Sequence, residues 1–229
     1  MHFNPAGGQI LTGSFEQIVK LWDPVRGSAE RILMGHIDNV RTVACSADGR
    51  IAATASYDGF VKIWDADAGR EIGALHGHYN SADLVTLDDE GKVAVTAGGD
   101  RTVKVWDVGS GRCRVTLSGF KDRVRSVALH TGLHRILTGD DSGAARLWDL
   151  DTGREIRGFS STTNLVKAVA FGPDGLVGFS GDDDGKVVKW ELDTGKRLLT
   201  IPASTLHVEA MAVRADGKRL LTGCSDSMI

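Results

Sequence analysis

Side chains that could carry out hydrolytic chemistry occur twice in the chain, as a histidine, a threonine and an aspartate at matched spacing. The two sets are His36, Thr54 and Asp58, and His78, Thr96 and Asp100. In a catalytic triad an acid orients a histidine, which takes the proton of a hydroxyl nucleophile. A reaction needs such a group once, so its repetition at a fixed spacing favours a structural role. No nucleophile elbow, phosphate loop or H-E-x-x-H run is present either, and we predict no enzyme and no catalytic residue.

Metal and cofactor sites are not predicted. The acidic run from Asp182 to Asp184 has the composition of a calcium loop, but it lacks the twelve-residue ligand spacing and precedes a turn glycine. The three cysteines are odd in number and lie at unrelated positions, which is typical of reduced thiols in a cytoplasmic protein. No apolar run of about 18 residues is present. We therefore expect a cytoplasmic protein without cofactor or metal.

The composition excludes few other classes. The chain has 229 residues, of which 41% are hydrophobic and 25% are charged, and this is ordinary for a globular protein. Its formal net charge of −3 at pH 7 gives no reason to expect binding to nucleic acid or to an anionic membrane.

The elements that position these residues are short strands. After Gly35-His36, apolar β-branched runs at 40–45, 51–55, 60–64 and 71–75 alternate with glycine-containing turns, and no helical period appears. Each unit is thus predicted to be a four-stranded antiparallel meander. Such a sheet has two apolar faces, so neighbouring units must cover each other.

All five tryptophans stand at one position of a repeat. They are Trp22, Trp64, Trp106, Trp148 and Trp190, and successive members differ by 42 in residue number. A repeat of this length is typical of solenoids, propellers and repeat arrays.

The repeats resemble those of the WD40 family. Gly35-His36 is followed after 28 residues by Trp64-Asp65, and Gly77-His78 by Trp106-Asp107, as in the Gly-His and Trp-Asp signatures of that family. The resemblance implies an all-β fold, a β-propeller of four-stranded antiparallel blades, with five 42-residue WD40 repeats plus a half blade.

The resemblance also implies a structural tetrad in which a tryptophan, a hydroxyl residue, a histidine and an aspartate form one hydrogen-bonded chain. Two repeats match it in full, with Trp64, Thr54, His36 and Asp58, and with Trp106, Thr96, His78 and Asp100. Others depart from it, with Phe120 or Thr162 at the histidine position and Ser142 or Glu16 at the aspartate position. We expect those blades to be held mainly by apolar packing and to be softer.

The repeat spacing predicts a single domain, 1–229, that is an incomplete propeller. Its parts are a partial blade (1–34), four full repeats (35–76, 77–118, 119–160 and 161–202) and a half blade (203–229). Three explanations remain open: a piece of a longer propeller, which we prefer, completion by a second chain, or closure within one chain. Open blade edges would favour self-association.

Function is expected at the exposed positions around the channel mouth, where the resemblance places partner binding. The candidate partner-binding face comprises Asn39, Arg41, Tyr57, Ser81, Asp83, Lys121, Arg123, Arg125, Asp141, Lys167, His207 and Glu209. Its four Lys and Arg side chains from 121 to 167 favour an acidic or phosphorylated peptide. We therefore predict a non-catalytic protein–protein interaction scaffold; the alternative is a structural module that completes a larger propeller or oligomeric assembly through its open blade edges.

Overall fold

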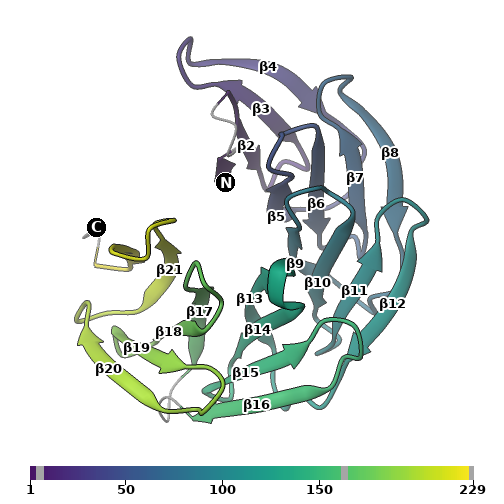
Figure 1. Ribbon diagram of the computed structural model, residues 1–229. Coiled ribbons are helices and arrows are strands. Elements are labelled where there is room, and N and C mark those ends of the chain that lie inside the picture. Colours follow the sequence, from purple (N-terminus) through teal and green to yellow (C-terminus); the bar gives the residue numbers. More distant parts are fainter. Residues whose placement is uncertain (4–7, 161–164, 227–229) are drawn as a thin grey trace. The chain divides into compact units, whose positions relative to one another are not determined.

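The computed structural model describes residues 1–3, 8–160 and 165–226, which form strands, turns and one short 3-10 turn (Figure 1). The chain separates into two compact units, Met1–Ser118 and Gly119–Ile229. Each unit consists of antiparallel sheets in which consecutive strands are hydrogen-bonded neighbours. The predicted all-β fold with four-stranded antiparallel sheets is confirmed.

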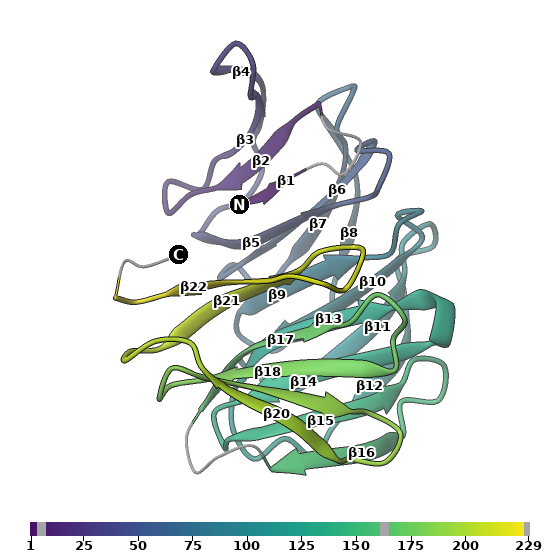
Figure 2. The ribbon, with the colours of Figure 1, turned by 60° about the vertical axis from the view of Figure 1, so that its left-hand side comes forward.

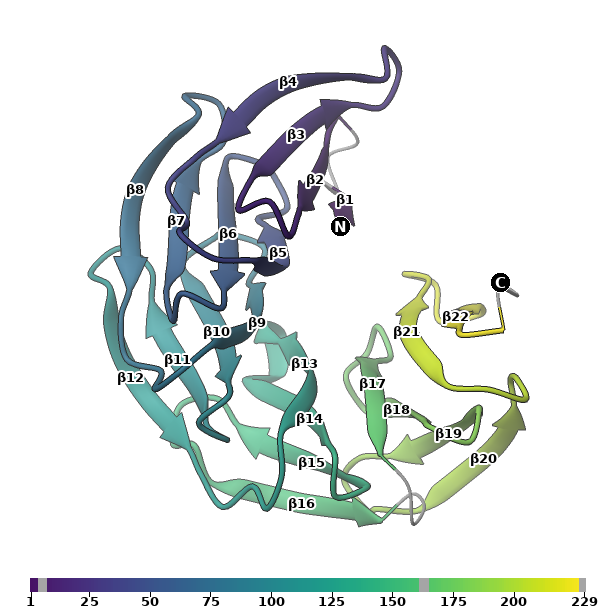
Figure 3. The ribbon, with the colours of Figure 1, turned by 180° about the vertical axis from the view of Figure 1, so that it is seen from behind.

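The first unit contains three four-stranded sheets. Their strands are β1 (His2–Phe3), β2 (Ile10–Gly13), β3 (Val19–Asp23) and β4 (Ser28–Leu33); β5 (Val40–Cys45), β6 (Ile51–Ser56), β7 (Val61–Asp65) and β8 (Arg70–Leu75); and β9 (Ala82–Leu87), β10 (Val93–Gly98), β11 (Val103–Asp107) and β12 (Arg112–Leu117). Figure 3 shows the sheet β5–β8 between the other two. The expected partial first blade is a sheet whose first strand has two residues.

The second unit contains two four-stranded sheets and one two-stranded sheet. Their strands are β13 (Val124–His130), β14 (Arg135–Asp140), β15 (Ala144–Asp149) and β16 (Glu155–Ser160); β17 (Val166–Phe171), β18 (Val177–Asp182), β19 (Lys186–Glu191) and β20 (Arg197–Pro202); and β21 (Val208–Val213) and β22 (Leu220–Cys224). The 3-10 turn η1 (Thr131–Leu133) joins β13 to β14. In Figure 2, β21 lies between β22 and the strands β17 and β18.

Apolar side chains between adjacent sheets form the core. In the first unit, Leu21 and Leu33 of the first sheet pack with Val43 and Trp64 of the second. In the second unit, Leu137 and Leu147 pack with Val169 in the same way. The second strand of a sheet is covered on both faces, so five of the six residues of β6, β10, β14 and β18 are buried. This burial explains the small and apolar residues of the second strands.

Each tryptophan stands at an irregularity in the sheet. The register between the third and fourth strands shifts immediately before Trp22, Trp64, Trp106, Trp148 and Trp190. A bulge changes the direction in which a side chain points. The register shift therefore recurs with the tryptophan in every four-stranded sheet.

Candidate interaction face and its polar framework

A buried polar chain joins four segments of the sheet β5–β8. The indole Nε1 of Trp64 donates to Oγ1 of Thr54 over 2.8 Å, and Nε2 of His36 lies 2.7 Å from the same hydroxyl oxygen. Nδ1 of His36 lies 2.7 Å from a carboxylate oxygen of Asp58. A neutral histidine satisfies every contact, because Nδ1 then donates to the carboxylate and Nε2 accepts from the threonine hydroxyl. The arrangement is that of the expected tetrad.

The sheet β9–β12 repeats this chain. Nε1 of Trp106 donates to Oγ1 of Thr96 over 2.8 Å, and His78 contacts this oxygen at 2.7 Å and Asp100 at 3.1 Å. Burial lowers the pKa of His78, although the Asp100 carboxylate acts in the opposite direction. Burial would raise the pKa of Asp100, but His78, the Thr102 hydroxyl and a backbone N–H together lower it.

Neither polar chain has the accessibility that nucleophilic catalysis requires. The side chains of Thr54 and Thr96 have 0% exposure, so a substrate cannot reach their hydroxyl groups. Each hydroxyl is also engaged by an indole and an imidazole. Among the residues that the structure describes, no group of three or more His, Cys, Asp or Glu side chains is arranged to hold a metal ion. The geometry fits a fold determinant.

The contact between indole and hydroxyl extends to all five tryptophans, including those outside the complete tetrads. Trp22 donates to Thr12 over 2.8 Å, Trp148 to Thr138 over 2.9 Å, and Trp190 to Ser180 over 2.9 Å. The third strand is thus fixed to the second at the same point in every four-stranded sheet.

The sheet β13–β16 replaces the histidine and aspartate of the tetrad with a different polar arrangement. Phe120 packs on Trp148 with ring centroids 5.0 Å apart, and the guanidinium of Arg146 lies 5.3 Å from the centre of the Phe120 ring. Nη1 of Arg146 also lies 3.1 Å from Oδ2 of Asp140, which is 1% exposed. The apolar packing that was expected for this sheet is thus accompanied by a buried ion pair.

Sequence reasoning missed the aspartates that end the second strands of the second unit. Oδ1 of Asp140 accepts from the backbone N–H groups of Ser142 and Ala144, and Oδ1 of Asp182 from those of Asp184 and Lys186. Both aspartates are 1% exposed. The sequence could have revealed them through their equivalent positions, 42 residues apart and directly before the tight turn. Thr162, expected at the histidine position, lies outside the described residues.

The candidate partner-binding residues lie in two groups of segments that backbone hydrogen bonds connect. In each of five sheets, the residue after the second strand donates its N–H to a carbonyl in the segment before the first strand. These hydrogen bonds run from Tyr57 to Asn39, Gly99 to Ser81, Asp141 to Arg123, Asp183 to Leu165 and Ser225 to His207, at 3.0–3.1 Å. We name this end of each sheet, formed by the segment before the first strand and the turn between the second and third, its loop face.

The loop faces of the first unit expose apolar and aromatic side chains that the sequence analysis did not select. Ile37 is 76% exposed and Tyr79 is 82% exposed, each directly after a tetrad histidine. Their backbone N–H groups donate to Asp58 and Asp100 over 3.2 and 3.0 Å. The buried tetrads therefore hold the backbone of two residues whose side chains project outward.

The other predicted positions of the first unit divide by exposure. Arg41 is exposed, and its guanidinium lies 5.3 Å from the centre of the Tyr57 ring. Asn39 and Ser81 are half-buried. Asp83 is only 3% exposed, so we remove it from the candidate surface.

The loop faces of the second unit contain a network of ion pairs. Arg125 Nε lies 2.7 Å from Asp141, and Lys167 Nζ lies 2.9 Å from Asp183 and 2.8 Å from Glu209. Nδ1 of His207 lies 2.8 Å from the same Asp183 oxygen. Burial opposes the charge of Lys167, but its two carboxylate partners raise the pKa of its amine. Arg125 and Lys167 are thus engaged by carboxylates, which reduces the positive charge on this surface.

A family comparison agrees with this geometry. The family model described as "WD domain, G-beta repeat" matches residues 27–65, 69–107, 111–149 and 153–191, which together cover more than half of the chain. The chain belongs to the WD40-repeat family. A search of curated proteins found no match. The predicted resemblance is therefore confirmed, and the four matched WD40 segments end at Trp64-Asp65, Trp106-Asp107, Trp148-Asp149 and Trp190-Glu191.

Membership in the WD40 family supports a coarse functional statement. WD40 domains generally mediate protein–protein interactions and generally act as non-catalytic scaffolds. No helix in the described part of the chain is long and apolar enough to cross a membrane.

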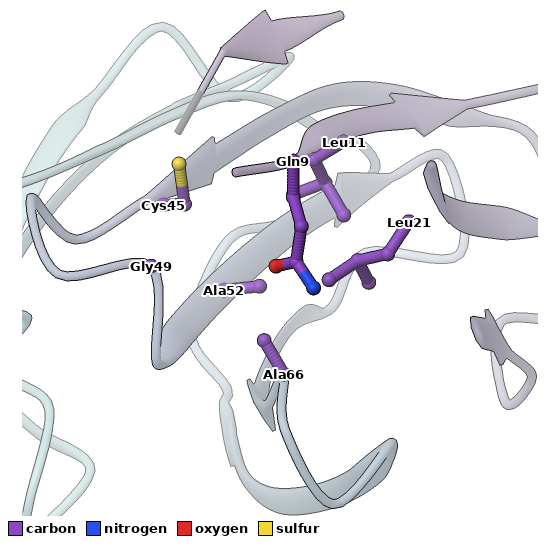
Figure 4. Close-up of a pocket in the computed structure, with 7 residues that line it drawn as sticks. All are labelled: Gln9, Leu11, Leu21, Cys45, Gly49, Ala52 and Ala66. Carbon is purple, nitrogen blue, oxygen red and sulfur yellow. The ribbon is translucent and has the colours of Figure 1, made fainter. Parts of the chain in front are cut away.

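The cavity between the first two WD40 sheets is too small for a ligand. Leu11, Leu21, Ala52 and Ala66 contribute to its lining, and the Gln9 side chain extends among them (Figure 4). Its volume is about 10 Å³, which is near the minimum for one water molecule. This cavity therefore offers no partner-binding site.

Proposed function

We propose that the chain is a non-catalytic scaffold that binds protein or peptide partners through its loop faces. The observation that carries the proposal is the pair Ile37 and Tyr79, whose side chains are exposed while their backbone is hydrogen-bonded to the tetrads. A backbone that is fixed before binding loses little conformational entropy in a complex. Exposed aromatic residues are also frequent among those that dominate binding energy. The loop faces of the first unit therefore supply anchors for an apolar segment of a partner.

The test is a selection of peptides on the immobilised chain, followed by affinity measurements with variants. Ile37→Ser and Tyr79→Ser should each weaken the selected peptides about tenfold or more. Val25→Ser is the matched control, because Val25 is 93% exposed in the turn between β3 and β4, at the opposite end of its sheet. Equal affinities for all three variants would contradict the proposal.

A finer proposal concerns partner charge. Lys121 and Arg123 precede β13 on the loop face of the second unit, and cations there favour an acidic or phosphorylated segment. Lys121→Glu and Arg123→Glu should then weaken acidic peptides selectively, while Lys196→Glu, an exposed cation in the turn between β19 and β20, should leave them unchanged. The same affinity for acidic and neutral peptides would show that peptide charge does not determine binding.

A second candidate function is completion of a larger assembly through an open sheet edge. The observation that favours it is the sheet β21–β22, in which the described residues form two strands and Leu221 is 58% exposed. Unpaired strand edges recruit further strands. Molar mass measured by light scattering over a concentration series tests this function, since a constant monomer mass would exclude self-association.

A further inference from the structure

Three sheets place a cation at the same bulge of their first strand. The register between the first and second strands shifts around Arg41 in the sheet β5–β8, around Arg125 in β13–β16 and around Lys167 in β17–β20. Each cation is the extra residue that the bulge inserts, and their residue numbers differ by multiples of the 42-residue repeat. Because a bulge changes the direction of its side chain, the three cations leave their sheets at equivalent points of the loop face.

In the two sheets of the second unit, the chain itself neutralises this cation. Arg125 Nε lies 2.7 Å from Asp141, and Lys167 Nζ lies 2.9 Å from Asp183. Both aspartates directly follow the second strand, and both donate their backbone N–H to the segment before the first strand. The tight turn of each sheet therefore supplies a carboxylate to the cation beside it.

In the sheet β5–β8 the same turn position supplies an aromatic ring. Tyr57 directly follows the second strand and donates its N–H to Asn39, as the two aspartates do in their sheets. The guanidinium of Arg41 lies 5.3 Å from the centre of the Tyr57 ring. An aromatic ring attracts a cation through its π electrons, but it does not accept the directed hydrogen bonds that a carboxylate accepts from a guanidinium.

No carboxylate of the described residues replaces the missing aspartate beside Arg41. Arg41 is exposed and forms no ion pair within residues 1–3, 8–160 and 165–226. Asp38 accepts instead from the backbone N–H of Asn39 over 2.7 Å, and Asp83 of the neighbouring strand β9 is only 3% exposed. The cation that the chain neutralises at Arg125 is therefore available at Arg41 to an external carboxylate.

Apolar side chains lie close to Arg41 on the loop faces of the first unit. Phe15, in the turn between β2 and β3, is 69% exposed, and Ile37 is 76% exposed. The Ser14 carbonyl accepts from the N–H of Val40 over 3.1 Å, so this turn abuts the segment that leads to Arg41. A ligand that reaches the guanidinium thus also meets apolar surface, which partly shields a charged hydrogen bond from water.

We propose that Arg41 binds a carboxylate side chain of a partner peptide, in a segment that has apolar residues beside the acid. Arginine recognises carboxylates through paired N–H donors, and the Tyr57 ring orients the guanidinium for this contact. The inference rests on the proposed loop-face function and deepens it by naming the acidic residue of the partner and the residue that binds it. This site is separate from the one proposed at Lys121 and Arg123.

The test is a parallel selection from a random-peptide display library on the immobilised full chain and its variants. Peptides selected on the original chain should be enriched in Asp and Glu, and Arg41→Gln should abolish this enrichment. Arg125→Gln is the matched control, because Arg125 occupies the same bulge but is engaged by Asp141, so its peptides should keep the enrichment. Urea denaturation verifies that each variant is folded.

Two substitutions of the ring examine why Arg41 differs from Arg125. Tyr57→Asp should also abolish the enrichment, because it gives Arg41 the internal carboxylate that the second unit already supplies at this position. Tyr57→Ser removes the ring without adding a carboxylate, so most of the enrichment should remain. The pair therefore separates neutralisation of the cation from loss of the aromatic contact.

An affinity measurement then connects the carboxylate to the guanidinium. A selected acidic peptide, labelled with fluorescein, and its counterpart with amides in place of the carboxylates are titrated by fluorescence anisotropy. Amide replacement should weaken binding to the original chain about tenfold, as expected for a lost charged hydrogen bond, and binding to Arg41→Gln less than about twofold.

The outcomes separate this inference from the proposed function. Selected peptides without acidic enrichment, or an enrichment that survives Arg41→Gln, would overturn the inference, while the loop faces could still bind apolar segments. Failure to select any peptide on the original chain would contradict both. An enrichment that Arg41→Gln and Tyr57→Asp abolish and Arg125→Gln preserves would support the inference.

Discussion

At the scale of the residue, the same tryptophan is fixed by different partners in different sheets. Trp64 reaches a threonine that a histidine also engages, whereas Trp148 reaches a threonine beside a phenylalanine. Removing the hydroxyl therefore leaves a different number of buried polar groups without a partner. The energetic cost of an unmade buried hydrogen bond, about 1–3 kcal/mol for each group, makes this difference measurable.

Thr54→Val should therefore destabilise the protein more than Thr138→Val, by about 1–3 kcal/mol in the free energy of unfolding. The first substitution deprives Trp64 and His36 of contacts at 2.8 and 2.7 Å, whereas the second deprives Trp148 of one at 2.9 Å and removes only a long contact, of 3.5 Å, to the Arg146 carbonyl oxygen. Both threonines are almost fully buried, so the two sites match in exposure. Urea denaturation of the two variants measures the difference. Equal shifts of the midpoint would show that the imidazole contact adds nothing.

The buried histidine of the sheet β9–β12 predicts a pH dependence. The pKa of His78 is lower in the folded protein than the ordinary 6.5, because burial disfavours the charged ring. Between the folded pKa and 6.5 the unfolded chain binds more protons than the folded chain. The contribution of His78 to stability is therefore fully present above about pH 6.5 and is lost as the pH is lowered through this window. The lowered pKa values of Asp58 and Asp100 act in a separate range, since their contributions are lost only below about pH 4.

His78→Gln should consequently flatten the loss of stability as the pH is lowered below about 6.5. Unfolding free energies of the variant and the original chain, measured by urea titration at several pH values, give the two slopes. His76→Gln is the control, because His76 is exposed in the same connecting segment. Identical slopes for all three proteins would mean that another group controls stability in this range.

At the scale of the element, the sequence predicted the strands and turns that recur in every repeat. It did not predict the contacts that replace the tetrad in individual sheets. The strands and the tight turns follow from the repeated pattern, and the two complete tetrads follow from the resemblance to the WD40 family. The partnership of Arg146 with Asp140 and Phe120 was not predicted, because each residue alone is ordinary and only the fold brings them together. The exposure of Ile37 and Tyr79 was missed for a related reason, since an apolar residue type does not reveal that its backbone is held outside the core.

The tight turn between the second and third strands also connects neighbouring sheets. Gly185 has φ of +75° and accepts backbone hydrogen bonds from Ala203 and Ser204. A Cβ at this position would lie 2.3 Å from the carbonyl oxygen of Ser204 and 2.5 Å from that of Leu206. These contacts involve backbone atoms, so they cannot be relieved by moving a side chain. The turn thus fixes the segment that leads to β21.

Gly185→Ala should therefore lower the free energy of unfolding more than Gly27→Ala does. Gly27 has a similar φ of +64°, but a Cβ there meets nothing within 4 Å. Gly27→Ala should cost about 1 kcal/mol for the backbone conformation, and Gly185→Ala a further 1–3 kcal/mol or so for the clash. Urea midpoints measure the difference, and hydrogen exchange should show the added loss of protection in β21 and β22. Equal costs would mean that the connecting segment moves away without penalty.

At the scale of the whole molecule, charge and exposed apolar surface act against each other. The net charge of −3 at pH 7 opposes association, and it approaches zero near pH 6.2. Leu221 of β22 is 58% exposed, and the apolar surface that it contributes does not change with pH. If the edge of β22 provides the attraction between chains, this strand is the surface that controls their association.

The average molar mass at a fixed concentration should therefore be greater at pH 6.2 than at pH 8, because the repulsion between chains is weakest near zero net charge. Leu221→Glu should prevent the increase by placing a charge on the apolar edge. Leu199→Glu changes the net charge by the same amount, so it separates the effect of position from that of charge. Light scattering at both pH values measures the masses, with circular dichroism to verify that the chains remain folded. If both variants reduce the mass equally, net charge alone controls association and the edge of β22 is not its site.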